Sequence, residues 1–316
     1  MTLRIGIQCA REKVRALIWE AGAMFAIIGI VVVLGAIVCG YMMEHGNLRV
    51  LIQPAELVII GGAATGTVLI ANPLFILKKI VGGMAGAFGG SPYSKAKYLE
   101  TLKMLSELLS RARKEGLMAL ETDSDAPDNS PVFSKYPKFL KEHYALHFVC
   151  DTLRMAASGG VEAFDMDQMM DRDMEVRHHE SIQAVTALST MADSLPGLGI
   201  VAAVLGVVIT MGALGGPPEE IGQKVAAALV GTFLGILLCY GFIGPLASSM
   251  AKRTEDEQAY YYVLRVVLVS FIKGVPPTVA VEFGRRAVPG HIRPTFQEAE
   301  SAIKNKGGDA PAPAAG

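Results

Sequence analysis

Residues 225–250 read VAAALVGTFLGILLCYGFIGPLASSM and contain no Lys, Arg, Asp or Glu. Three more uncharged apolar runs occupy residues 21–43, 57–77 and 196–214. Each run has about twenty residues or more. A helix of that length crosses the roughly 30 Å hydrocarbon core of a bilayer. The runs form two pairs, one before and one after a long charged middle segment. The sequence therefore predicts four transmembrane helices.

The overall composition agrees with a membrane protein that also has a soluble part. Of the 316 residues, 51% are hydrophobic and 19% are charged, and the mean hydropathy is +0.38. A large soluble protein with buried core helices is the alternative, but four runs of this length disfavour it. The net charge of −1 gives no sign of nucleic-acid binding. The four cysteines show no CxxC or Cys/His spacing, so we expect free thiols, no metal and no cofactor.

These patterns predict an all-α membrane protein with four transmembrane helices and a large helical cytoplasmic domain. The expected parts are an N-terminal cytoplasmic arm or start extension (1–23), transmembrane helices 1 and 2 (24–77), a cytoplasmic domain (78–194), transmembrane helices 3 and 4 (195–250), a C-terminal cytoplasmic helical region (251–306) and a disordered tail (307–316).

The distribution of basic residues predicts the orientation in the membrane. Basic side chains flank the apolar runs at Arg4, Arg11, Lys13, Arg15, Lys78, Lys79, Lys252 and Arg253. The two short connectors contain only Arg49 and Lys224. Because cytoplasmic segments carry an excess of Lys and Arg, both termini and the long middle segment are expected in the cytoplasm.

Apolar periodicity and breaker residues predict the helices outside the membrane. Pro73 is expected to kink or loosen the end of the second span. The expected elements are a glycine-rich connector at 82–92, helices at 94–113, 138–157, 165–195 and 251–273, and a solvated acidic loop at 121–131.

Four stretches, in order along the chain, resemble the MotA family, the larger stator subunit of the bacterial flagellar motor. They are QPAELVIIGGAATG (53–66), DSLPGLGIVAAVLGVV (193–208), AALVGTFLGILLCYGFIGPLA (227–247) and PPTVAVEFGRR (276–286) followed by RPTFQEAE (293–300). Residues 1–23 lie outside the resemblance.

The resemblance implies a subunit of an ion-driven torque generator in the bacterial inner membrane. Five copies would surround two copies of MotB, a single-span partner anchored to the cell wall. Because the four uncharged runs contain no carboxylate, the partner would supply the transmembrane Asp that carries the ion. Residues 78–194 would be the torque-generating domain, acting on FliG of the rotor switch.

The resemblance also assigns roles to four residues of the third and fourth spans. Pro196 and Pro245 match prolines that flank the ion path and couple it to cytoplasmic movement. Their simpler interpretations are a helix start for Pro196 and a kink near the membrane edge for Pro245. Thr232 would face the partner's acid, although an intramembrane Thr usually donates to the preceding turn of its own helix. Ala203 matches a small residue beside the same path.

Two charged residues in RARKEGLMALE (111–121) match rotor-contacting positions of the family. They are Arg113 and Glu121, which on sequence alone would simply be solvated charges at a helix end. The neighbouring His178, His179 and Glu180 could suggest a metal site, but adjacent side chains point to different faces of a helix. A solvated helix is the favoured interpretation there.

The ion is expected to be a proton, because the third span offers almost no side-chain oxygen, whereas a hard cation requires several oxygen ligands. No GxSxG, P-loop or catalytic carboxylate pair indicates an enzyme. Two alternatives remain open at this point. One is a membrane energiser resembling ExbB and TolQ, which have three spans. The other is a non-conducting membrane scaffold.

Overall fold

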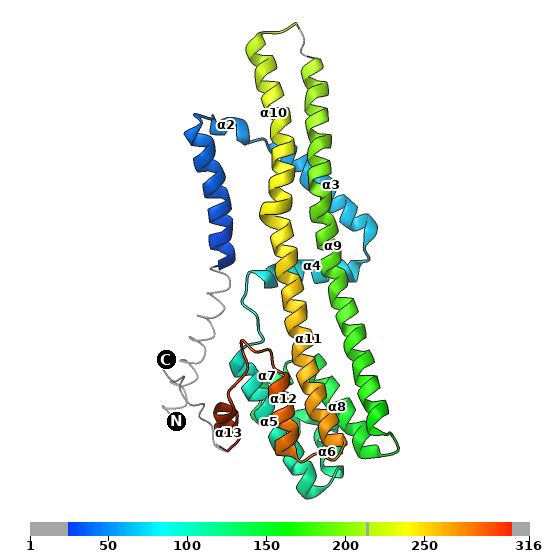
Figure 1. Ribbon diagram of the computed structural model, residues 1–316. Helices are drawn as coiled ribbons and strands as arrows, with labels where there is room; N and C mark the ends of the chain where they lie inside the picture. The colour runs from blue at the N-terminus through cyan, green and yellow to red at the C-terminus, as the bar shows by residue number, and fades with distance from the viewer. Residues whose placement is uncertain (1–24, 213–214, 305–316) are drawn as a thin grey trace. The chain divides into compact units, whose positions relative to one another are not determined.

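The computed structural model describes residues 25–212 and 215–304, and all regular elements in those ranges are helices. Four helices are long and apolar enough to cross a membrane: Phe25–Met43, Leu48–Ala71, Ala163–Met211 and Pro218–Ile272. The prediction of an all-α chain with four candidate spans is therefore confirmed (Figure 1). The expected arm at 1–23 and tail at 307–316 lie outside the described residues.

The chain divides into two compact units, and the first contains the four apolar segments. It comprises residues up to 90 together with 180–254. Its elements are the helix Phe25–Met43, α2 (Leu48–Leu51), α3 (Pro54–Ala71), α4 (Leu74–Ala87), the second half of α9 (Ala163–Met211), α10 (Pro218–Leu237), the π-helical turn η3 (Leu238–Ile243) and the beginning of α11 (Gly244–Ile272).

The second span ends earlier than the apolar run that predicted it. Helix α3 stops at Ala71, where the Asn72 side chain donates to the Val68 carbonyl at 2.9 Å and Pro73 follows. The expectation of one helix through residue 77 is wrong, because Pro73 lacks the N–H that would continue the helix. Residues 74–77 instead begin α4, the short cyan helix that crosses α9 and α11 in Figure 1.

The glycine-rich segment at 82–92 is largely helical, which corrects the expectation of a connector. Helix α4 continues to Ala87. Gly83 lies against the Met250 side chain, and the Arg253 guanidinium donates to the Gly86 carbonyl. Glycines here allow α4 to approach α11 closely, and apolar side chains of α4, α9 and α11 form one core beneath it.

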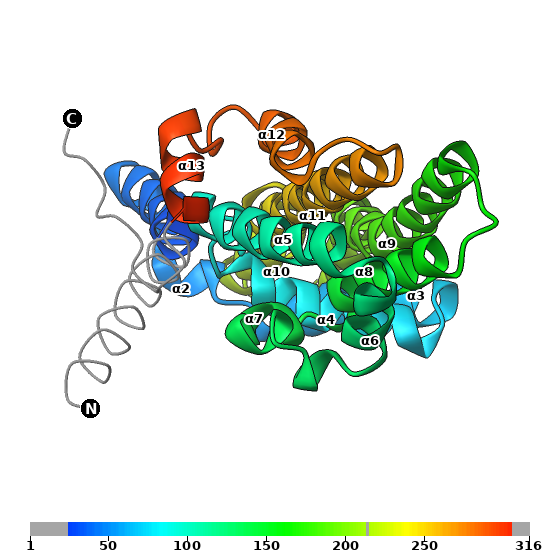
Figure 2. The ribbon, with the colours of Figure 1, turned by 90° about the horizontal axis from the view of Figure 1, so that it is seen from below.

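The second unit contains residues 91–179 and the described residues from 255 onward. Its elements are α5 (Lys95–Glu115), α6 (Met118–Asp125), η1 (Pro127–Asn129), η2 (Phe133–Lys135), α7 (Pro137–Leu140), α8 (His143–Ser158), the first part of α9, the last part of α11, α12 (Pro277–Ala287) and α13 (Phe296–Lys304). Helices α12 and α13 both contact α5, and α6 contacts α8 (Figure 2).

The core of this unit is built mainly from α5, α8 and α11. Tyr260 of α11 is fully buried, and its hydroxyl is 2.8 Å from the Thr101 hydroxyl of α5. The other large, fully buried side chains of this core include Tyr98, Leu102, Leu105, Leu109, Phe133 and Leu153. The expected helices at 94–113, 165–195 and 251–273 are confirmed by α5, α9 and α11. Helix α8 begins at His143 rather than at 138, because Pro137–Leu140 forms a separate turn.

The acidic segment at 121–131 is not the solvated loop that its composition predicts. Residues up to Asp125 belong to α6, and Asp123 is only 1% exposed. Its carboxylate accepts from Arg111 Nη1 at 2.9 Å and from the Ser130 hydroxyl at 2.7 Å. A partner cation and hydroxyl thus make burial of this carboxylate possible.

Candidate ion path at the seam of α9 and α10

Small residues bring the backbones of α9 and α10 into direct contact along one seam. A Cβ on Gly235 would lie 2.6 Å from the Leu195 carbonyl oxygen and 2.9 Å from Gly199 Cα. A Cβ on Gly206 would lie 2.7 Å from Ala228 Cβ. Neither glycine can accept a larger side chain without moving a helix, which is how helices associate closely in membranes.

Pro196 lies well inside α9, next to this seam. It follows Leu195, whose carbonyl faces Gly235 of α10. The simpler interpretation of Pro196 as a helix start is therefore wrong. Because proline has no N–H, it cannot donate to the carbonyl of Ala192, and α9 lacks one backbone bond at this point.

Pro245 follows an irregular turn that the sequence did not reveal. Residues 238–243 form a π-helical turn in which the Gly244 N–H donates to the Cys239 carbonyl five residues earlier. Pro245 is exposed and is the second residue of α11. A π turn of this kind is rare and is frequent at functional sites.

Ala203 and Thr232 lie at the same level of the seam. The Ala203 nitrogen is 3.2 Å from the position that a Gly231 Cβ would occupy, and Thr232 is the next residue of α10. Among the described residues the Thr232 hydroxyl has no hydrogen-bond partner, whereas Thr210 donates to the Gly206 carbonyl at 2.8 Å. Thr232 therefore does not follow the usual intrahelical bonding of a membrane threonine, and its half-buried hydroxyl can serve another group.

A carboxylate that the sequence analysis missed reaches the same place. Glu56 lies in the first turn of α3, is 7% exposed, and its Oε2 has no hydrogen-bond partner. A Cβ on Gly231 would lie 2.7 Å from that oxygen. The uncharged run starts at residue 57, but α3 begins at Pro54. Because proline is common at the first position of a helix, Pro54 is the sequence signal that places Glu56 inside the helix.

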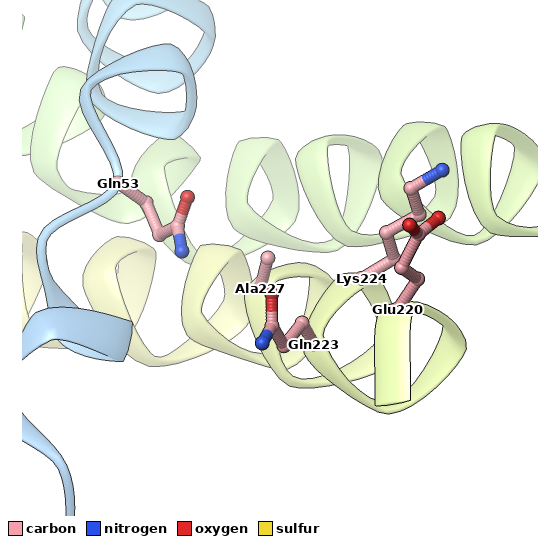
Figure 3. A pocket seen from close by; sticks show the side chains of 5 residues that line it. All are labelled: Gln53, Glu220, Gln223, Lys224 and Ala227. Atoms are coloured by element: carbon pink, nitrogen blue, oxygen red, sulfur yellow. The ribbon is translucent and has the colours of Figure 1, made fainter. Parts of the chain in front are cut away.

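A polar depression, shown in Figure 3, is lined in part by Gln53, which precedes Glu56 by about one helical turn. Its volume is about 460 Å³, and it lies between the start of α3 and the first turns of α10. Its lining residues are Gln53, Glu220, Gln223, Lys224 and Ala227. Gln53 precedes Glu56 by three positions and Ala227 precedes Gly231 by four, so both helices lead from the depression to the buried carboxylate.

Arg113 and Glu121, the two residues of the motif at 111–121 that match rotor-contacting positions, lie on either side of the turn at Gly116. Arg113 is exposed in the last turn of α5, and Glu121 is half-buried in the first turn of α6. Neither forms a hydrogen bond or ion pair within the described part of the chain, unlike Arg111, which binds Glu115 and Asp123. Their side chains are thus available to another molecule.

No metal site accompanies these features in the described ranges, where no group of three or more His, Cys, Asp or Glu could hold an ion. Cys39, Cys150 and Cys239 are free, and Cys9 lies outside the described residues. Burial raises the pKa of the Cys150 thiol to about 12, so this thiol is unreactive.

Nearly the whole chain is similar to known motility proteins. The family sequence model of the motility protein A N-terminal region matches residues 27–116. The family sequence model of the MotA/TolQ/ExbB proton channel family matches residues 140–262. Motility protein A of Escherichia coli (strain K12) is 39% identical over 89% of this chain and 97% of that protein. Motility protein A of Salmonella typhimurium is 38% identical over 89% and 95%.

Solved structures show the same fold. The structure of Campylobacter jejuni (C. jejuni) MotAB aligns with a TM-score of 0.69 and 18% identity over 84% of this chain and 96% of that one. The flagellar MotAB stator complex from Bacillus subtilis aligns with a TM-score of 0.61 and 25% identity over 81% and 92%. The chain belongs to the motility protein A family, the A subunits of flagellar stators within the MotA/TolQ/ExbB proton channel family.

Proposed function

We propose that this chain assembles with a MotB-like single-span partner into a proton-conducting stator that exerts torque on the rotor protein FliG. Five copies would surround a partner dimer whose transmembrane Asp carries the proton. The similar structures are MotAB complexes, which supports this class of partner. The apolar surfaces of the candidate spans support further assembly, because at most 28% of the most apolar stretch of any span is buried within the single chain.

The observation that carries the proposal is the convergence of Ala203 and Thr232 on the glycine seam. The free Thr232 hydroxyl provides a polar group at membrane depth, and Ala203, which lies at the level of the preceding residue Gly231, carries only a methyl side chain. Pro196 and the π turn before Pro245 are weak points in the hydrogen bonding of the two helices. Protonation of the partner's acid would change packing here and move α9 and α11.

Proton transport fits this seam better than sodium transport. Residues 196–209 of α9 have no side-chain oxygen, so Glu56 and Thr232 are the side-chain oxygen donors identified at this level, and a dehydrated Na⁺ would need several more. The basic flanks of the spans support cytoplasmic termini and a cytoplasmic segment at 78–194 in the inner membrane. Residues 24–77 and 195–250 would form the membrane part, and residues 251–306 would join the cytoplasmic part.

The exposed Arg113 and the half-buried Glu121 would contact opposite charges on FliG. Surface charge sets the register of such a transient contact.

Affinity purification of this chain from its native membranes tests the proposal. The expected result is co-purification of a single-span protein with an Asp in its membrane segment, in a ratio of about five to two. Recovery of this chain alone, from cells that contain such a protein, would contradict the partner assignment. A complex that forms but rotates independently of an ion gradient would favour the scaffold alternative.

A further inference from the structure

We propose that Glu56 is a second proton carrier of the path, which takes protons from the polar depression and passes them toward the level of Ala203 and Thr232. This inference rests on the proposed stator function and adds a titratable group from this chain to the acid expected from the partner. A hydronium ion in the depression would transfer its proton to Glu56 Oε2, leaving water and a neutral carboxylic acid. Release of that proton on the inner side would regenerate the carboxylate.

The first argument is the environment of the carboxyl group. Glu56 is more than nine-tenths buried and its Oε2 has no partner. A buried carboxylate without a partner is costly, so a structural carboxylate normally has one. Asp123 of the same chain illustrates the difference, because it is also more than nine-tenths buried but accepts from Arg111 and Ser130.

The second argument is that the surrounding backbone leaves room for this group. Gly231 faces Oε2, and any side chain at that position would meet it at 2.7 Å. The next residue is Thr232, whose hydroxyl is also unpartnered. A Cβ on Gly231 would also lie 3.2 Å from the Ala203 nitrogen, so the Glu56 carboxylate reaches α10 at the level of Ala203, and Thr232 is one residue further along that helix.

The third argument is access from the outer solution. In the proposed topology the short connectors face outward, so the depression at the start of α3 and α10 opens on the side from which protons enter. Its Gln53 and Gln223 amides and the charged Glu220 and Lys224 can hold water (Figure 3). Glu56 lies one helical turn further in.

The ionisable groups on the neighbouring elements are few. Helix α2 carries Arg49, and α10 carries Glu219, Glu220 and Lys224 in its first turns. Helix α9 has no ionisable residue between Asp193 and its end at Met211. Glu56 forms no ion pair with any of them among the described residues.

The test compares Glu56→Gln, Glu56→Asp and the control Glu219→Gln in cells, with rotation speed measured at low load over a range of external pH. Glu219 is an exposed carboxylate in the first turn of α10 that does not line the depression. Glu56→Gln preserves shape and removes the titratable proton, so speed should fall about tenfold or more. Its remaining speed should rise in proportion to external proton concentration, since protons must then reach the inner acceptor directly. Glu56→Asp and Glu219→Gln should behave like the wild type.

Recovery of the complex with its partner distinguishes a relay from a structural role. A relay role predicts equal recovery of the wild-type, Glu56→Gln and Glu56→Asp complexes. Wild-type speed and pH dependence in Glu56→Gln would overturn it, as would loss of the complex in that variant. A wild-type motor that turns without a proton gradient would instead overturn the proposed function, so the two failures are distinguishable.

Discussion

Arg111 and Arg113 lie two positions apart in α5 but have opposite relations to the rest of the protein. Arg111 binds Asp123, which is 1% exposed, and therefore belongs to the fold. Arg113 is exposed and forms no hydrogen bond or ion pair in the described ranges. The half-buried Glu121 has no such partner there either. Residue type alone does not separate a structural charge from an available one, and the sequence motif contains both kinds.

Charge reversal at Arg113 or Glu121 should impair rotation or stator recruitment and leave assembly intact. Exposed charges contribute little to folding, whereas a reversed charge repels its partner across an interface. Motility and co-purification with the partner should be measured together. Normal swimming of the double variant Arg113→Glu/Glu121→Lys at normal expression would count strongly against a rotor contact.

Arg111→Ala is the matched comparison for these reversals. It should lower the free energy of unfolding of the helical unit by about 3 kcal/mol, because Asp123 stays buried without its cation. Thermal unfolding of the purified protein measures this change. A stability equal to that of Arg113→Ala would show that the buried pair has no structural role.

Acid should weaken the end of α12 through Glu282. Hydrogen bonds from Arg285 and Arg286 hold the pKa of Glu282 at about 2, below its usual 4.5. Its contribution to stability is therefore present above about pH 4.5 and is lost as the pH falls toward 2. Glu282→Gln should be less stable than the wild type at pH 7, and the difference should shrink toward pH 3. Denaturant unfolding at both pH values tests this, and a pH-independent difference would contradict it.

At the scale of the helix, the contact of α9 with α10 depends on glycine at particular positions. Gly235→Ala should lower the midpoint of thermal unfolding and abolish rotation, because its Cβ would lie 2.6 Å from the Leu195 carbonyl. Gly222→Ala on the same helix is the control, since nothing lies within 4 Å of its Cβ position. The two variants should therefore differ, and equal midpoints with normal rotation in both would show that the seam tolerates widening.

The two prolines should be required for torque but not for assembly. Pro196→Leu restores a backbone donor inside α9, and Pro245→Leu allows the π turn to become regular helix. Neither change buries a charge, so insertion and partner binding should persist while rotation is lost. Thr232→Val should weaken rotation at nearly constant side-chain volume. Normal rotation of both proline variants would remove the coupling role of these helices.

The helices were largely predictable from the sequence, and the site was predictable in part. Apolar length and periodicity identified the spans and the long α5, α9 and α11. Composition misled at Asp123, where a distant arginine permits burial, and at the glycines of α4, which serve a helix crossing. Glu56 was missed because a hydropathy run excludes a charged residue even when the helix includes it. Which polar groups lack partners depends on tertiary contacts, and only the structure reports these.

At the scale of the whole molecule, we propose that the membrane unit conducts the ion along the seam of α9 and α10 and that the helical unit works against the rotor. The ion gradient and the torque must then be coupled through this chain. Every proposed role, from Thr232 to Arg113, depends on that coupling, and the proposed ion is a proton.

Rotation speed of single motors, measured while the proton-motive force and the sodium concentration are varied independently, tests this claim most directly. Rotation driven by protons predicts that speed is proportional to the proton-motive force, collapses with a protonophore and is unchanged when potassium replaces sodium. Speed that follows sodium concentration at a fixed proton-motive force would show that the ion is not a proton.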